Sequence, residues 1–425
     1  MTLEGLQEVP TETKLVVGVV SGSELINHSY LVLLPPILGL LAEEFEVSVA
    51  LLGIAIGSRG AASAIFQLPF GYLSDRYTRT LGLGLSLGLG SLGTLLTAVA
   101  PSFIVLAIAQ VIIGIGIAGH HPSHFPLLSD AVTEDQRARA FSIRGFAGSV
   151  GFGAPPAIIT AVLSFPGTTW RHAVGALGVF GLLYGVLAVA LFSRYVSADV
   201  TRPAPRDATA DNSALTDRIA SELRSIAEMP AILALAALAG ITAIATGGVR
   251  TYAVIHLTQG YGASLEAANL TLTAMFVAGA IMMLVGGVLA DRLPAGTVML
   301  AGYALVGVLL IGLASLVIPT LVAMALVIGT QALVSVTGPA RSKLIDKLSA
   351  RTALGQSFAV MTVGLMLGGT IAPPLFGALI EYAGLRITFL VIALTAFLAL
   401  LVAGAVVVTY DEEFSIRRPV HPADD

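Results

Sequence analysis

The sequence predicts an all-α polytopic membrane protein in which twelve transmembrane helices form two pseudo-symmetric halves of six. Hydrophobic residues make up 56% of the 425 residues and charged residues only 11%, whereas a soluble domain carries about 25% charge. The mean hydropathy is +0.90. Apolar segments of about 20 residues, long enough to cross a bilayer, recur along the whole chain. Landmarks of the first half also return in the second, which indicates an internal duplication.

One polar stretch separates the apolar segments into two groups of six. We therefore expect an N-terminal half over residues 1–194, a central cytoplasmic loop over 195–229 and a C-terminal half over 230–425. Within the loop, residues 215–226 predict a short amphipathic helix that lies on the membrane surface. The twelve expected spans lie near residues 15–41, 49–73, 80–99, 102–128, 140–165, 171–194, 231–257, 265–290, 295–316, 319–340, 355–380 and 385–409.

The two halves repeat each other at a nearly constant offset of 215 to 218 residues. Four independent landmarks at one offset indicate a duplication. They are Gly71/Asp75/Arg76 with Gly287/Asp291/Arg292, Pro122 with Pro339, Pro155/Pro156 with Pro373/Pro374, and Arg171 with Arg386.

The placement of lysine and arginine predicts the orientation. Of the 22 basic residues, 18 fall on the same side as the loop at residues 72–80, and only Arg171 and Arg386 fall on the opposite face. The other two, Arg59 and Arg250, lie within spans. We therefore expect a multi-pass protein of the cell's inner (plasma) membrane, with that loop and both termini in the cytoplasm.

The first span carries the strongest candidate for a proton site. Glu24, Asn27 and His28 are three or four residues apart and share one helical face. Charged groups inside a span are costly and usually functional. We expect Glu24 and His28 to take part in proton coupling, with Glu24 paired to His28 or to Arg59 of the second span. The alternative is that Glu24 and Arg59 only neutralise each other and hold the two helices together.

The seventh span carries Arg250 but no acidic residue, which suggests that a transported anion is its partner. The alternative is an arginine that extends toward the outer interface. We assign the following residues to a substrate-binding cavity: Asn27, Tyr30, Arg59, His120, His121, His124, Arg250, Thr251, Tyr252, His256 and Gln331.

Three histidines follow one another in the fourth span. His120 and His124 are four residues apart, but Pro122 and Pro126 are expected to disturb the helix, and no glutamate lies between the histidines as in a zinc-hydrolase motif. We expect no metal and no cofactor. The prolines are expected to free backbone carbonyls that line a cavity, where a histidine handles protons or substrate.

The turn between the second and third spans has the pattern Gly-x-x-x-Asp-Arg-x-x-Arg, with Thr78 where a glycine is usual. This pattern resembles the signature loop of the major facilitator superfamily of secondary transporters. The resemblance implies the major facilitator fold and a loop that holds one conformation of the transport cycle. The residues assigned to this conformational motif and its second copy are Gly71, Asp75, Arg76, Arg79, Arg144, Gly287, Asp291 and Arg292.

The run from Asn27 to Tyr30 and the pair His121-Pro122 look like the fosmidomycin-resistance branch of that superfamily. The relatives usually have His-x-x-Asn-Asp in the first helix, whereas this chain has Glu24-Leu25-Ile26-Asn27-His28. The branch implies export of small phosphonate-like or amphiphilic compounds against protons. Ala154 departs from the glycine that exporters place before the proline in the fifth helix.

These observations predict a proton-coupled exporter of an anionic or amphiphilic compound that works by alternating access. The alternative is proton-coupled uptake of an organic anion, and a more remote one is a membrane sensor that transports nothing. No phosphate-binding Gly-x-x-x-x-Gly-Lys-Ser/Thr run and no cysteine are present, and no nucleophile with a base is spaced for catalysis, so we expect no enzyme. We expect a monomer in the bilayer that binds a small molecule and protons but no nucleic acid.

Overall fold

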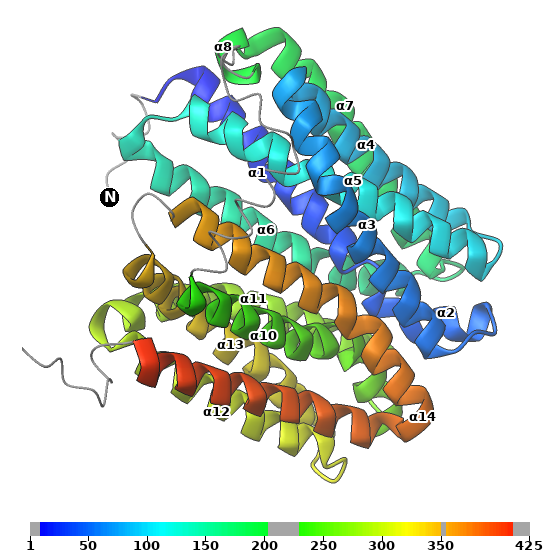
Figure 1. The fold of residues 1–425 in the computed structure, drawn as a ribbon. Coiled ribbons are helices and arrows are strands. Elements are labelled where there is room, and N and C mark those ends of the chain that lie inside the picture. The colour runs from blue at the N-terminus through cyan, green and yellow to red at the C-terminus, as the bar shows by residue number, and fades with distance from the viewer. Residues whose placement is uncertain (1–8, 203–228, 350–353, 411–425) are drawn as a thin grey trace, which may run out of the picture. The chain divides into compact units, whose positions relative to one another are not determined.

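The computed structural model describes residues 9–202, 229–349 and 354–410, and within these ranges it contains helices and no strand (Figure 1). This confirms the predicted all-α fold. The central loop lies mostly outside the described residues, as does its predicted helix at 215–226. The elements are α1 (Thr11–Leu31), η2 (Pro35–Ile37), α2 (Leu38–Glu44), α3 (Val49–Arg76), α4 (Arg79–Val99), α5 (Phe103–Ala131), α6 (Glu134–Leu163), α7 (Trp170–Tyr195), α8 (Ala198–Thr201), α10 (Pro230–Ile255), η3 (His256–Gly260), α11 (Leu265–Arg292), α12 (Ala295–Ala314), α13 (Thr320–Leu348) and α14 (Leu354–Tyr410).

Eleven helices of the described chain are long and apolar enough to cross a membrane, and the last of them accounts for two spans. Helix α14 has 57 residues, which at about 1.5 Å per residue is more than twice the thickness of a hydrocarbon core. Its path changes at Gly384, where φ is 79° and ψ is 170°. Only glycine adopts this conformation readily. With α14 divided there, the described residues contain the twelve predicted spans.

The first span is interrupted near its end. Helix α1 stops at Leu31, and η2 and α2 continue to Glu44. Pro35 has no N–H to donate to the carbonyl of Leu31, four residues earlier, so the helical hydrogen bond is lost at this point. Arg59 of α3 replaces it by donating from Nη2 to Leu31 O at 2.8 Å and from Nη1 to Tyr30 O at 2.9 Å.

The described chain forms two compact units whose boundaries differ from those of the two expected sequence halves. The first unit contains the described part of Met1–Ala210 together with Arg250–Val277 and Pro373–Tyr382. In it, α4 packs against α5 and α7, α3 packs against α5, and α1 packs against α6 (Figure 1). Glycines permit these close contacts: a Cβ at Gly114 of α5 would lie 2.2 Å from the carbonyl oxygen of Arg59.

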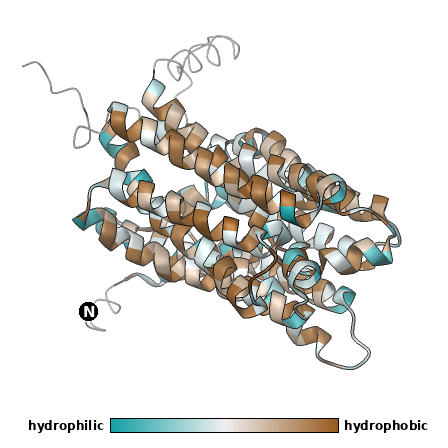
Figure 2. Ribbon diagram, turned by 90° about the horizontal axis from the view of Figure 1, so that it is seen from below, coloured by the Kyte–Doolittle hydropathy of each residue, from teal (hydrophilic) through white to brown (hydrophobic). Residues whose placement is uncertain are grey.

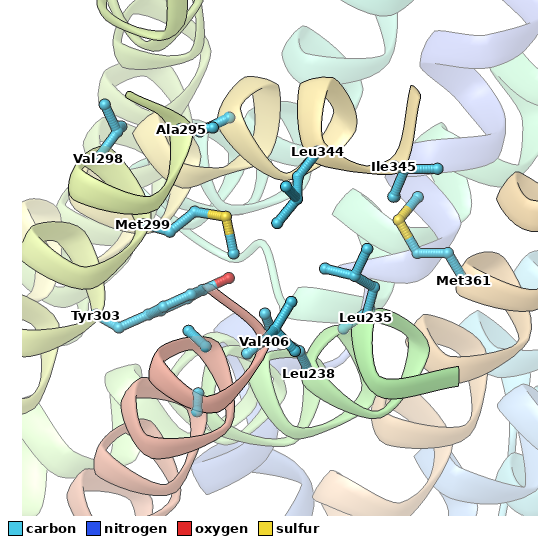
Figure 3. Packing of buried hydrophobic residues seen from close by; sticks show 14 of the residues in the cluster. Leu235, Leu238, Ala295, Val298, Met299, Tyr303, Leu344, Ile345, Met361 and Val406 are labelled. Atoms are coloured by element: carbon cyan, nitrogen blue, oxygen red, sulfur yellow. The ribbon is translucent and has the colours of Figure 1, made fainter. Parts of the chain in front are cut away.

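The second unit has an apolar core of its own, shown in Figure 3. Leu235 and Leu238 of α10 meet Met299 and Tyr303 of α12 there, with Val406 of α14 beside them. All five side chains are at most 1% exposed. The core is therefore built from helices far apart in sequence.

Large apolar side chains also face outward over much of the surface. Leu68 is 83% exposed and Ile65 is 69% exposed, and the ribbons in Figure 2 are hydrophobic over most of their length. A soluble monomer rarely exposes apolar surface on this scale. Contact with lipid tails accounts for it.

Candidate functional site

A buried carboxylate, Glu24 of α1, is the centre of a charged cluster in the first unit. The residue is 1% exposed, and its Oε1 is ion-paired with Nη1 of Arg144 from α6. Its Oε2 lies 2.9 Å from Nε2 of His120 and 3.9 Å from Nε2 of His124, both from α5. His28, one turn later in α1, places Nε2 3.5 Å from Oε1. Of the two predicted pairings of Glu24, the contact with His28 is present.

The histidines of α5 keep a common face because the helix is not broken. Pro122 and Pro126 do not break it: α5 is continuous from Phe103 to Ala131 with both prolines inside, and the expected disturbance is limited to the loss of helical hydrogen bonds. His120 and His124 therefore remain one turn apart. Nδ1 of His124 lies 2.9 Å from the carbonyl oxygen of His120, which fixes the ring so that Nε2 points toward Glu24 and lies 3.3 Å from Nη1 of Arg144.

One carbonyl that loses its helical donor to a proline accepts a hydrogen bond from a serine hydroxyl, whereas we expected such carbonyls to line a cavity. Pro126 has no N–H, so the carbonyl of Pro122, four residues earlier, loses its helical donor. Oγ of Ser74 donates to that oxygen at 3.3 Å. Ser74 lies in the signature loop, so this hydrogen bond joins the loop to the histidine helix.

The assignment of Arg144 to the conformational motif near the cytoplasmic boundary stays a prediction. Its guanidinium is ion-paired with Glu24. It also lies over the rings of Phe125 and Phe141, with Cζ 4.8 and 5.9 Å from the ring centroids. The guanidinium of Arg144 is therefore stabilised both by a carboxylate and by two aromatic rings.

Several polar atoms of this cluster have no hydrogen-bond partner within the described residues. Asn27 Nδ2, His120 Nδ1, His121 Nδ1 and Arg144 Nε are all buried and unpaired. Buried polar atoms normally bond to protein or ordered water. The unpaired atoms are therefore available to water or to a bound molecule.

Three side chains of this cluster, those of Glu24, His120 and His124, carry atoms that can bind a metal ion. The ligand atoms of Glu24, His120 and His124 all lie within 4.8 Å of one another. However, the guanidinium of Arg144 contacts both Glu24 and His124, so a cation already occupies the position that a metal would take. The cluster fits an arginine better than a metal, and the absence of a metal site stays a prediction.

Arg59 does not pair with Glu24, so that predicted pairing was wrong. Its guanidinium donates to Tyr30 O, to Leu31 O and, at 3.3 Å, to Oε1 of Gln110. The side chain is needed there because α1 ends beside it with unpaired carbonyls. Arg59 therefore joins α3 to the end of α1 through backbone carbonyls and not by neutralising Glu24.

Arg250 of α10 lies over two aromatic rings that stack on each other. Its Cζ lies 5.0 Å from the ring centroid of Phe152 in α6 and 5.5 Å from that of Phe276 in α11. Among the described residues no carboxylate forms an ion pair with it, and its buried Nε has no hydrogen-bond partner. The guanidinium therefore keeps donors for an anion.

The remaining residues assigned to the cavity are mostly buried in packing contacts. The hydroxyl of Tyr30 bonds Oγ of Ser91 at 2.8 Å, and that of Tyr252 donates to the carbonyl oxygen of Pro373. Gln331 donates to Oγ of Ser335 at 3.2 Å in the second unit. Thr251 and His256 are 5% and 0% exposed. Whether any of them touches substrate stays a prediction.

The signature loop ends α3 and begins α4. Thr78, where a glycine is usual, is the N-cap of α4 and accepts a hydrogen bond from the backbone N–H of Leu81 at 3.1 Å. Arg79 reaches Oδ2 of Asp130 at 2.5 Å and the carbonyl oxygen of Val200 at 2.9 Å. The other residues assigned to the motif, Gly71, Asp75, Arg76, Gly287, Asp291 and Arg292, lie at the ends of α3 and α11.

Comparison with known proteins identifies the family. The family model of the Major Facilitator Superfamily matches residues 23–254 and 235–422. The chain belongs to this superfamily. The resemblance inferred from the signature loop is thereby confirmed, and the protein is a multi-pass membrane transporter rather than an enzyme.

Individual members of the superfamily resemble most of the chain. An uncharacterized MFS-type transporter of Bacillus subtilis, YfnC, is 26% identical over 390 residues, which is 89% of each chain. The fosmidomycin resistance protein of Escherichia coli is 25% identical over 280 residues, 65% of each chain. A crystal structure of a bacterial homologue of the human lysosomal transporter Spinster, inward-facing and unoccupied, superposes with a TM-score of 0.77 at 18% identity and covers 93% of this chain and 97% of its own. At that identity the likeness shows the fold alone.

Proposed function

We propose that this protein is a proton-coupled secondary transporter that exports an anionic or amphiphilic small molecule by alternating access. The observation that carries the proposal is the buried ion pair between Glu24 and Arg144, surrounded by three histidines. Ionisable groups placed this way in transporters typically belong to proton or substrate pathways.

Glu24 can exchange its ion-pair partner, Arg144, for a proton. If α6 moves and Arg144 leaves, Glu24 becomes an unpaired buried carboxylate, which costs several kcal/mol. Protonation of Glu24 removes that charge. The carboxylate can thus alternate between an ionised state paired with Arg144 and a protonated state without it, and His28, in contact with Glu24, is the second group of the proton site.

Arg250 is our candidate for recognition of the substrate anion. The guanidinium lies over the rings of Phe152 and Phe276, and these contacts do not consume its N–H donors. A carboxylate or phosphonate can accept two parallel hydrogen bonds from such a guanidinium. The relative named as a fosmidomycin resistance protein supports an anion of this type and supports export.

Proton-coupled uptake of an organic anion is the second candidate, because Arg250 would recognise an anion moving in either direction. The sign of the driving gradient separates the two. In proteoliposomes, an acidic lumen drives accumulation by an antiporter, and an acidic exterior drives accumulation by a symporter. Fosmidomycin, a phosphonate that stays ionised, is a suitable probe.

The decisive variant is Glu24→Gln, which keeps the shape of the side chain but cannot carry the charge. We expect it to abolish accumulation driven by a pH gradient and to spare counterflow, which needs no net proton movement. Glu44→Gln, which changes an exposed carboxylate paired with Arg171, is the control and should leave both unchanged. Accumulation that still follows the pH gradient in Glu24→Gln would move the proton site to the histidines of α5.

We propose that the protein lies in the inner membrane of the cell and that both of its termini are in the cytoplasm. The chain contains no cysteine, so single cysteines can be introduced without removing others. An impermeant maleimide applied to intact cells should label Thr168→Cys, between α6 and α7, and should not label Thr133→Cys, between α5 and α6. The reverse pattern would overturn the orientation. Light scattering of the purified protein tests the expected monomer.

A further inference from the structure

We propose that Phe152 is the positioning residue that couples the proton site at Glu24 to the anion site at Arg250, an inference that rests on the proposed function of those two sites. The two sites belong to repeat-related spans, the first and the seventh. Phe152 of α6 is in ring contact with members of both.

The contacts form a continuous row within the first unit. The imidazole of His28 stacks on the ring of Phe152 with centroids 4.3 Å apart and planes 29° apart. Phe152 stacks in turn on Phe276 at 5.4 Å and 16°, and the guanidinium of Arg250 lies over both phenyl rings. His28 contacts Glu24 at its other end. One phenyl ring therefore separates the carboxylate cluster from the arginine.

Helix α6 makes Phe152 move with the counter-ion of Glu24. Arg144, Gly148 and Phe152 are spaced four residues apart on one face of α6, so they follow one another along the helix. Arg144 pairs with Glu24, and one turn later a Cβ at Gly148 would lie 2.6 Å from Nδ1 of His28. The face of α6 is thus matched, turn by turn, to the face of α1 that carries the proton site.

The backbones of the two helices are also close at this level. A Cβ at Gly151 would lie 2.2 Å from the carbonyl oxygen of Leu25, and Oγ of Ser29 donates to the carbonyl oxygen of Gly151 at 3.1 Å. A shift of α6 that separates Arg144 from Glu24 must therefore also slide Phe152 along His28. The same shift changes the surface on which Arg250 rests.

Electrostatics gives the coupling in the opposite direction. A phenyl face attracts a guanidinium or a charged imidazole more strongly than a neutral group. Both the guanidinium of Arg250 and the imidazole of His28 are attracted to the ring of Phe152. An anion that draws Arg250 away from that ring leaves His28 as the remaining partner of these two. The charge of His28 depends in turn on Glu24, which it contacts, and on the charged and titratable groups around that carboxylate. These are Arg144, His120 and His124, which contact Glu24, and His121, whose ring lies beside those of His120 and His124.

The first test compares Phe152→Leu with Phe276→Leu in proteoliposomes, using fosmidomycin. Both variants remove a ring beside Arg250, but only Phe152 also stacks on His28. We expect Phe152→Leu to lower accumulation driven by a pH gradient about tenfold while counterflow stays within about threefold, because Phe276 still lies beside Arg250 whereas the contact with His28 is lost. Phe276→Leu should change the affinity for the probe and keep the accumulation ratio, and Phe152→Tyr should behave as the wild type. Equal accumulation in Phe152→Leu and the wild type, or equal losses in the two leucine variants, would overturn the proposal.

The second test does not depend on transport. A double-mutant cycle of His28→Gln and Arg250→Gln, read as shifts in melting temperature, measures how strongly the two residues depend on each other. We expect a non-additive shift in the Phe152 background and additive shifts in the Phe152→Leu background. Additivity in both backgrounds, or the same non-additive shift in both, would refute the role of Phe152. If the wild type shows no pH-driven accumulation but the cycle behaves as expected, the proposed function fails and the coupling stands.

Discussion

The ion pair between Glu24 and Arg144 should couple far more strongly than an ion pair at the surface. Two unit charges about 4 Å apart interact by about 4 kcal/mol at an effective dielectric constant of about 20. Glu24 is 1% exposed and the pair is in direct contact, so we expect a coupling free energy of about 3–4 kcal/mol in a cycle of Glu24→Gln, Arg144→Gln and the double variant. Each single variant leaves a buried charge, and the double variant leaves none.

The chain supplies a matched control. Glu44 and Arg171 form an ion pair with Nη2 2.6 Å from Oε1, but their side chains are 39% and 30% exposed, so their coupling should be at most about 1 kcal/mol. Reversible unfolding with SDS in mixed micelles gives the four free energies of each cycle. The measurement belongs at alkaline pH, where neutral histidines cannot replace the missing arginine. A buried coupling no larger than the control would refute the assignment of Arg144 as the counter-ion.

Three further predictions concern the loop and the packing. Asp75→Asn should reduce transport and leave probe binding within a few-fold; a loss of binding as large as the loss of flux, measured by titration, would contradict this. Arg59→Gln should lower the free energy of unfolding by about 2–5 kcal/mol because two buried carbonyls lose their donor; loss of probe binding at unchanged stability would instead support the assignment of Arg59 to the substrate-binding cavity. Gly114→Ala should destabilise the protein because its Cβ would meet a backbone oxygen at 2.2 Å, whereas Gly71→Ala, with nothing within 4 Å, should not lower the melting temperature.

Sequence alone predicted the spans well because bilayer thickness fixes their length. The expected span at 49–73 corresponds to α3 at Val49–Arg76, and the expected pair at 355–380 and 385–409 corresponds to α14 on either side of Gly384. The interruption of the first span at Pro35 was not predicted. Whether a proline ends a helix depends on the surrounding contacts: Pro35 does so where Arg59 can take the carbonyl, and Pro122 does not.

The centre of the candidate site was predicted only in part. Glu24 stood out because a carboxylate in a span is conspicuous, but its partner depends on how α6 is rotated about its axis. Spacing within one span predicted the contact with His28, since residues four apart share a face. No such rule connects Glu24 with Arg144, 120 residues later. The series Arg144, Gly148 and Phe152 at intervals of four was the available signal for an α6 face directed at the site.

The hydrogen bond from Ser74 to the carbonyl oxygen of Pro122 has a consequence for how related sequences can change. The acceptor exists because Pro126 lacks an N–H. A residue other than proline at position 126 would return a donor to that carbonyl and remove the need for a hydroxyl at position 74. The two positions should therefore vary together across homologues, although one lies in the loop and the other on the histidine helix. A transporter that changes only one of them must give the carbonyl oxygen of Pro122 a different donor.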